Sequence, residues 1–453
     1  MANISVKSTI GTGKAPLMRI FGMALLVILL QIPILKIDGV ISERRSTRDN
    51  AVAEVTQKWG EQQTLKGPQI IVPYLVDVKR PQGTAWIIAP EERYAVFLPE
   101  RFDAGVKIQS EVRYRSIYGI PLYRAQIQLD GEFDRGKMET AAGDRKLQWE
   151  KAQFVIAISD PKSVKGETSL QFNGRTIALE PGTGRGLTGQ NGFHAPLTLL
   201  AANGKSKFRI SLEMGGSDGF YVAPVGRHSS IHIDSNWVDP SFQGNWLPTQ
   251  RTVTDRGFNA VWEIPYLGRN YPQSWFEHCD RYEQKMQESV VGVDLAFPLD
   301  TYGKTERSIK YELIFIGLTF IGFWLFEVLS GVRIHPVQYL LVGGAICLFY
   351  LLLLSLAEHI GFLGAYFIAA FMVISLVTVY ARNVLKNGGR AALVGGGMTA
   401  LYLYLLALLQ EQEYSLLAGS IGLFVILALI MFLTRNISWY TAPEEKPVAE
   451  NAE

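Results

Sequence analysis

LMRIFGMALLVILLQIPILKI (residues 17–37) leads directly into ISERRSTRDN (41–50), so an apolar run ends against three arginines. The apolar run is long enough to cross a bilayer, which takes about 20 residues in a helix. Lys7, Lys14 and Arg19 lie before or within its start, as in a signal peptide, but no small-x-small cleavage site follows it. We interpret residues 17–37 as an uncleaved signal anchor, with a cleaved leader as the alternative.

Further apolar runs lie late in the chain, and each is close to the length of a membrane span. A soluble chain has no need for such helices joined by short links. The composition agrees, because 48% of residues are hydrophobic and only 19% are charged. We predict an α+β membrane protein with six transmembrane helices, one N-terminal and five C-terminal. The late spans are 312–330, 338–356, 362–381, 391–410 and 416–434.

The charges of the short links predict how these helices are oriented. Basic residues follow the second, fourth and sixth helices, whereas the links AEHIGF and QEQEYS carry no lysine or arginine. Since basic short loops stay in the cytoplasm, residues 1–16 and 435–453 are predicted to be cytoplasmic and residues 38–311 to lie outside. The three arginines beyond residue 37 carry little weight here, because the rule is weak for long translocated domains. The deciding basic residues are Arg333, Arg382, Lys386, Arg390, Arg435 and Lys446.

The outside region has the pattern of a β domain. Runs such as QIIVPYLVDV (69–78) and KFRISLEM (207–214) mix or alternate apolar and polar residues, as half-buried antiparallel strands do. Turn residues such as Asn173-Gly174 separate the runs. Many short strands favour a sandwich-like, β-rich domain inserted between the first and second spans.

Residues 40–66 form the exception at the start of this domain. Ile41, Val52, Val55 and Trp59 recur at helical spacing, which predicts a juxtamembrane helix. Arg44 and Arg48 lie four residues apart and would share one face of that helix.

A basic group is predicted at the outer membrane surface. Arg44 and Arg48 flank the first span, and Arg307 and Lys310 flank the second. Guanidinium groups match phosphate oxygens, so this group is a candidate site for lipid or envelope-precursor headgroups. The alternative is ion pairing with the acidic residues nearby in the sequence, which is common near membranes.

An acidic group is predicted at the outer ends of the later helices. Glu358, His359 and Glu411 would mark an ion path, because ionisable groups at membrane depth are often functional. The alternative is an ion-pair collar, since water reaches helix ends. His228, His232 and Asp234 alternate along one strand, but their spacing matches no known zinc pattern, so no metal or cofactor is predicted.

Several function classes are disfavoured by the sequence. A net charge of +2 does not suggest a nucleic-acid partner. Two cysteines, Cys279 and Cys347, cannot make a disulfide framework. No catalytic arrangement can be recognised, so we expect a protein that is not an enzyme. The oligomeric state cannot be read from the sequence.

The chain contains several long, specific strings, which include ERRSTRDNAVAEVTQKWGEQQTLKGPQIIVPY (43–74), RYRSIYGIPLYRA (113–125), SNWVDPSFQGNWLP (235–248), GVDLAFPLDTYGKTERSIKYELIFIGLTF (292–320) and MFLTRNISWY (431–440). In these strings the chain resembles a known family, the CreD family of inner-membrane proteins. The resemblance implies a bacterial inner-membrane location, a periplasmic β-rich domain and a role in cell-envelope integrity. It also implies expression under a two-component regulator, a part in the β-lactam response and colicin tolerance, but no catalytic residues.

Two functions follow as expectations. The first is an envelope-integrity protein whose periplasmic domain binds an envelope or lipid component, with membrane lipids and a periplasmic protein as candidate partners. The alternative is a transporter or flippase that uses the C-terminal helices. The lack of an internal repeat weakens the alternative, because transporters are often built from repeats.

Overall fold

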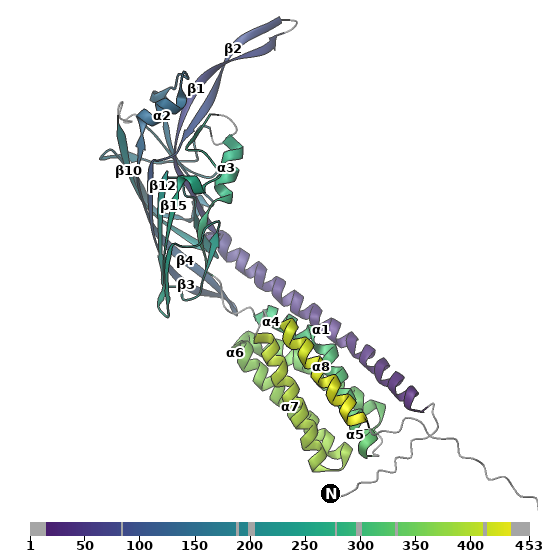
Figure 1. The fold of residues 1–453 in the computed structure, drawn as a ribbon. Coiled ribbons are helices and arrows are strands. Elements are labelled where there is room, and N and C mark those ends of the chain that lie inside the picture. The colour runs from purple at the N-terminus through teal and green to yellow at the C-terminus, as the bar shows by residue number, and fades with distance from the viewer. Residues whose placement is uncertain are drawn as a thin grey trace, which may run out of the picture. The chain divides into compact units, whose positions relative to one another are not determined.

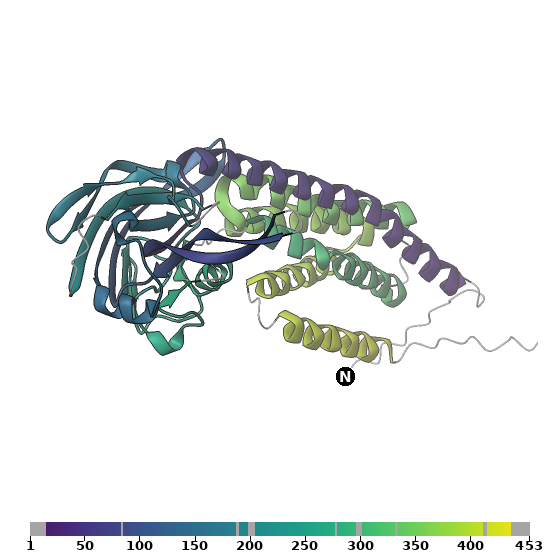
Figure 2. The same cartoon turned by 90° about the horizontal axis from the view of Figure 1, so that it is seen from above.

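The structure is a computed structural model with two compact units, shown in Figures 1 and 2. The helix unit combines Met1–Thr47 with Leu299–Glu453, and the β unit comprises Arg48–Pro298. The boundary falls inside the first helix. The structure describes residues 15–82, 85–186, 190–197, 204–276, 279–295, 301–330, 334–410 and 415–435.

The first helix, α1 (Ala15–Trp59), is longer than a single membrane span. It runs for 45 residues without a break, so the predicted span and most of the predicted juxtamembrane helix form one element. The helix ends before residue 66, however, since β1 already begins at Gln63. Gly60 marks the change with φ +141, and a Cβ there would lie 2.7 Å from the backbone oxygen of Gly215. The predicted juxtamembrane helix, residues 40–66, was therefore too long at its C-terminal end, because residues 63–66 belong to β1.

The remaining long helices of the helix unit agree closely with the late apolar runs. One face of α1 packs against them through buried residues at helical spacing, Leu30, Ile34, Ile37 and Ile41. Gly343 makes room for this contact, because a Cβ there would lie 2.2 Å from Leu30 Cδ1. The late helices are α4 (Thr301–Lys310), α5 (Glu312–Ser330), α6 (Pro336–Leu385), α7 (Gly388–Gln410) and α8 (Ser415–Thr434).

Helix α6 is a helical hairpin rather than one rod. Gly361 has φ 75 and ψ 163 in its middle, which is not helical geometry. The rings of Phe349 and Tyr366 lie 5.4 Å apart, centroid to centroid. On one straight helix these residues would be roughly 25 Å apart at 1.5 Å per residue. The chain therefore reverses at Gly361, between the two runs predicted as separate spans.

Some helices of the described chain are long and apolar enough to cross a membrane. Three are long and apolar enough on their own, and the bent pair Tyr302–Lys310 and Glu312–Glu327, with an angle of 46°, counts as a fourth if the pair is one span. The apolar part of α8, Leu417–Phe432, is shorter. The three helices are Phe21–Trp59, Pro336–Leu385 and Gly388–Gln410. Candidate membrane helices are thus confirmed.

The β unit contains two large sheets, as the strand patterns predicted. The nine-stranded sheet has the order β13-β17-β11-β1-β5-β9-β8, with β2 paired to β1 and β16 paired to β2. Its strands are β1 (Gln63–Gln82), β2 (Ala85–Phe97), β5 (Gln153–Ile158), β8 (Glu180–Pro181), β9 (Gly192–Pro196), β11 (Gly219–Val222), β13 (Pro240–Gly244), β16 (Ser274–Trp275) and β17 (Val291–Leu295). Two short helices, α2 (Arg135–Ala142) and α3 (Cys279–Glu288), accompany the sheets.

The eight-stranded sheet has the order β14-β15-β12-β3-β4-β10-β6-β7. The β3–β12 pair is parallel, and the other pairs of this sheet are antiparallel. Its strands are β3 (Arg101–Arg115), β4 (Tyr118–Asp134), β6 (Val164–Phe172), β7 (Arg175–Ala178), β10 (Lys205–Ser217), β12 (His228–Ser235), β14 (Gln250–Thr254) and β15 (Gly257–Pro265).

The two sheets pack face to face around one hydrophobic core. Phe154 of β5 contacts Phe133 of β4 and Phe208 of β10, with ring centroids 6.2 and 5.6 Å away. These contacts join the two sheets. Because side chains alternate along a strand, the opposite face of the eight-stranded sheet is left to polar residues.

The outer parts of β1 and β2 extend from the sandwich as a two-stranded ribbon (Figure 1). Trp86 and Ile88 near its end are 70% and 68% exposed. Arg80 on β1 and Glu91 on β2 form an ion pair across the ribbon at 2.8 Å.

Candidate functional site

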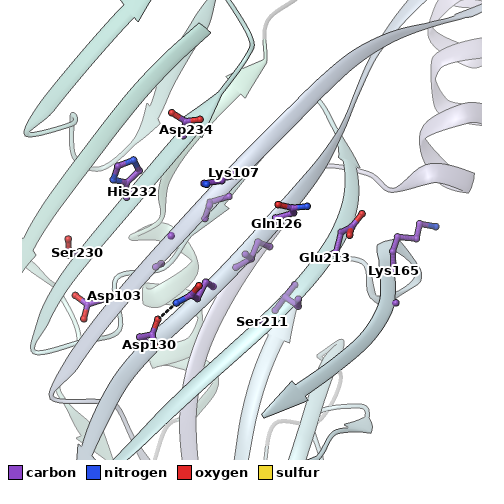
Figure 3. Close-up of a pocket in the computed structure, with 17 residues that line it drawn as sticks. Asp103, Lys107, Gln126, Asp130, Lys165, Ser211, Glu213, Ser230, His232 and Asp234 are labelled. Carbon is purple, nitrogen blue, oxygen red and sulfur yellow. Dashed lines mark hydrogen bonds between the residues drawn. The ribbon is translucent and has the colours of Figure 1, made fainter. Parts of the chain in front are cut away.

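The outward face of the eight-stranded sheet carries a broad polar hollow of about 1000 Å³ (Figure 3). Strand β3 shows how the sequence creates it. Phe102, Ala104, Val106 and Ile108 are buried, whereas Asp103 and Lys107 between them point outward. The neighbouring strands repeat this alternation, so their polar residues line up in rows across the sheet.

Three rows cross the hollow, and strand pairing fixes each of them. The first row consists of Asp234, Lys107, Gln126, Glu213 and Lys165 on β12, β3, β4, β10 and β6. The second row consists of His232, Gly105, Gln128 and Ser211. The third row consists of Ser230, Asp103, Asp130 and Arg209. We call this set of rows the polar face.

The third row is internally neutralised. Asp103 and Asp130 lie directly opposite each other, which is unfavourable for like charges. Arg101 Nε binds Asp103 at 2.6 Å, and Arg209 Nε binds Asp130 at 2.5 Å. Gln128 also donates to Asp130, at 2.8 Å. The acidic groups of this row are therefore already paired within the protein.

The first row keeps unused charges. Within the described chain, the side chains of Lys107, Gln126 and Glu213 form no hydrogen bond or ion pair. Asp234 accepts a hydrogen bond of 3.4 Å from Asn259. Lys107 and Glu213 flank Gln126, so a positive and a negative group stand on either side of an amide. This row offers both charges and hydrogen-bonding groups to a ligand.

Gly105 forms the floor of the hollow in the second row. A Cβ there would meet only one atom within 4 Å, the backbone oxygen of Gln128 at 3.9 Å. The lack of a side chain between His232 and Gln128 leaves open space on the sheet. Any solvent-exposed sheet face is polar. This face differs because it is hollowed and because Lys107 and Glu213 have no ion-pair partner in the described chain.

A buried network positions β12, which forms one side of the polar face. Arg269 Nη1 donates to the carbonyl oxygens of Pro224 and Val225 at 3.0 and 2.9 Å. Tyr271 OH donates to the same oxygen of Pro224 at 2.8 Å. Burial raises the pKa of Tyr271 to about 12. The network holds the segment that leads into β12.

The predicted basic residues have partners within the protein. Lys310 pairs with Glu306 at 3.6 Å, and Arg307 Nε donates to the carbonyl oxygen of Gly303 at 3.4 Å. Arg48, on α1, interacts electrostatically with Asp218. Arg44 also interacts with the surrounding protein. These contacts favour the ion-pairing alternative, and headgroup binding stays a prediction.

Of the predicted acidic group, the structure describes Glu358 and His359, which follow each other in α6. Glu358 is half-buried and accepts a hydrogen bond of 2.9 Å from Tyr302. His359 is exposed on α6. Glu411 lies outside the described residues. Glu327 of α5 is also buried, and it accepts a hydrogen bond of 3.4 Å from Tyr339.

The histidines of the β unit do not form a metal centre. Among the described residues, no group of three or more His, Cys, Asp or Glu side chains is placed to hold a metal ion. His232 bonds with Asn259 at 2.7 Å, and His228 pairs with Glu263 at 3.1 Å. His232 and Asp234 instead belong to the polar face.

Comparison with known proteins places the whole chain in one family. The family model described as "Inner membrane protein CreD" matches residues 15–440. The chain is also 33% identical to the inner membrane protein CreD of Escherichia coli strain K12 over 416 residues. That alignment covers 91% of each chain.

Proposed function

The chain belongs to the CreD family of inner membrane proteins, and from this premise we propose that it supports the integrity of the cell envelope by binding an envelope component at the polar face. The observation that carries the proposal is the first row of that face. Lys107 and Glu213 have no partner in the described chain, although both lie at a hollow large enough for a ligand.

The ligand class follows from the lining. Phe, Tyr and Trp are absent from the described lining of the hollow, and its side chains include four carboxylates and two lysines. Such a surface favours an extended polar ligand with both charges, such as a wall peptide, over a lipid tail. Charge-assisted hydrogen bonds to such a ligand contribute about 1.5–3 kcal/mol each.

The proposed topology puts the polar face in the periplasm. Residues 17–37 act as a signal anchor, α5, both arms of α6, α7 and α8 complete six crossings, and both termini are cytoplasmic. The charged links support this orientation, and the reversal at Gly361 supports two crossings by α6. Membrane lipids are then partners of the helix unit. The protein acts by binding, without catalysis.

The test uses a strain that lacks the protein and is sensitised to envelope stress. The Lys107→Ala/Glu213→Ala variant should restore resistance poorly at wild-type abundance. Binding of purified wall peptides to this variant should be at least about 10-fold weaker, because two charge-assisted contacts are removed. Full rescue together with unchanged peptide binding would refute the proposal.

The matched control removes the same two charge types from elsewhere in the β unit. Asp144 and Lys146 are exposed, and the Asp144→Ala/Lys146→Ala variant leaves the polar face intact. It should behave as wild type. A further variant that lacks the β unit but keeps the helices should give no rescue.

The second candidate is a transporter or flippase whose path runs through the helix unit. The half-buried Glu358 and its bond to Tyr302 favour some role for this carboxylate. Neutralising Glu358, His359 and Glu411 should then abolish rescue without lowering abundance. Unchanged rescue would count against transport along this path.

A further inference from the structure

A second polar cluster lies inside the helix unit, apart from the groups considered above. Glu312 of α5, Tyr350 of α6 and Tyr402 of α7 are only 4%, 0% and 3% exposed. Gln31 of α1 interacts with Glu312, and Cys347 and Tyr350 lie within electrostatic range of it. Four helices thus contribute polar groups to one buried place.

Several buried atoms of this cluster have no hydrogen-bond partner among the residues that the structure describes. They are Glu312 Oε2, Gln31 Nε2, Tyr350 OH and Tyr402 OH. Leaving a buried polar group unpaired costs about 1–3 kcal/mol, and a buried unpaired charge costs more. A cluster with this many unpaired atoms is a place where a small ligand would be stabilised.

The charge of Glu312 is also uncompensated. Among the described residues, the groups that interact with it from the packed helices are Gln31, Cys347 and Tyr350, none of which is basic. Glu312 forms no ion pair within the described chain. An ionised carboxylate at membrane depth is costly, so it needs a cation or a proton.

A helix break lies at the same residue. Helix α4 ends at Lys310, α5 begins at Glu312, and the two are bent by 46°. Glu312 therefore lies directly after the break between the two helices. Broken helices beside buried ionisable groups are a feature of ion sites in membrane proteins.

We propose that Glu312 is a reversible proton-binding site of the helix unit. When protonated, its carboxyl group donates a hydrogen bond to a neighbouring oxygen; when ionised, it accepts from the unpaired Gln31 Nε2 and Tyr350 OH. The proton comes from water and returns to it. A metal ion is less suited, since it prefers several oxygen ligands and only one carboxylate is present.

The test is infrared difference spectroscopy of the full-length protein in lipid nanodiscs during a pH change. Wild type should show the carbonyl band of a protonated carboxyl group appearing and disappearing with pH. Glu312→Gln should lose this band. Tyr350→Phe should keep the band at a shifted frequency, because a hydrogen-bonding neighbour is removed.

The matched control is Glu327→Gln, which alters a buried carboxylate that already accepts a hydrogen bond from Tyr339. It should retain the band assigned to Glu312. An unchanged band in Glu312→Gln would overturn the proposal, as would a band that responds to sodium at constant pH. If Glu312→Gln does not fold, the frequency shift in Tyr350→Phe decides alone, and no shift refutes the assignment. The outcome is independent of ligand binding at the polar face.

Discussion

Gly105 shows at the scale of one residue how a missing side chain creates a surface. Its backbone is ordinary strand, and the space above it is open. Gly131 on the adjacent β4 is glycine for the opposite reason, because a Cβ there would lie 2.2 Å from the backbone oxygen of Arg101. Two glycines in paired strands thus serve different purposes.

Gly105→Val should fill the hollow without destabilising the β unit. A β-branched residue suits a strand, so we expect the free energy of unfolding to stay the same or rise by up to about 1 kcal/mol. Wall-peptide binding should fall. Denaturant unfolding and a binding titration measure the two effects.

Gly131→Val is the contrasting variant, and it should lower stability by about 1–3 kcal/mol through overpacking. Equal stability of the two variants would contradict the difference in free space around Gly105 and Gly131. Retained peptide binding in Gly105→Val would place the ligand elsewhere.

Tyr271 should make stability sensitive to alkaline pH. Its pKa is raised to about 12 in the folded protein from about 10 in the unfolded chain. Its contribution is therefore complete below about pH 10 and is lost as the pH rises through about 12, by up to about 3 kcal/mol. Unfolding of the full-length protein in detergent, followed by tryptophan fluorescence at several pH values, measures the loss.

Tyr271→Phe should be less stable by about 1 kcal/mol at neutral pH, because the hydrogen bond to Pro224 is removed. The gap between wild type and variant should close above about pH 10 and reverse as the pH rises towards 12, because only the wild type loses stability there. A gap that stays constant across this range would contradict the assigned proton linkage.

At the scale of elements, the apolar runs predicted the helices well because spanning length and composition are local properties. The run 312–330 coincides with α5, and 416–434 differs from α8 by one residue at its start. The polar face could not be predicted in this way. Lys107, Gln126, Glu213 and Lys165 meet only through strand pairing between segments far apart in the chain.

The buried cluster illustrates a second limit. Glu312 begins a predicted span and reads in the sequence as a surface residue near arginines. Only the packing of α1, α6 and α7 around it reveals that it is enclosed. The signal available in advance was an acidic residue at the start of an apolar run.

Gly361→Ala should disturb the reversal of α6. Its φ of 75 and ψ of 163 suit glycine alone, although no atom would obstruct a Cβ. We expect a loss of about 1–3 kcal/mol from backbone strain. Thermal unfolding in detergent measures it.

Gly344→Ala provides the comparison in the same element. Gly344 has helical geometry with open space around its Cβ position, so alanine should stabilise by up to about 1 kcal/mol. If neither substitution changed the thermal stability, the left-handed backbone geometry assigned to Gly361 would be contradicted.

At the scale of the whole molecule, the proposed topology predicts where reporters work. Alkaline phosphatase inserted after Lys146 should be active, because it folds only outside the cytoplasm. The same enzyme inserted after Lys386, between α6 and α7, should be inactive. Green fluorescent protein at these positions should give the reverse pattern. Phosphatase activity confined to the second insertion would invert the orientation.

The ribbon formed by β1 and β2 has a cost for solubility. Beyond Tyr74, its strands pair with no further strand in the described chain, so both edges expose backbone donors and acceptors. Such edges recruit other chains into intermolecular sheets, and charged side chains oppose this. Lys79 and Arg80 on one strand and Glu91 and Glu92 on the other thus act as guards against aggregation, and losing them would bring fibril formation on overproduction.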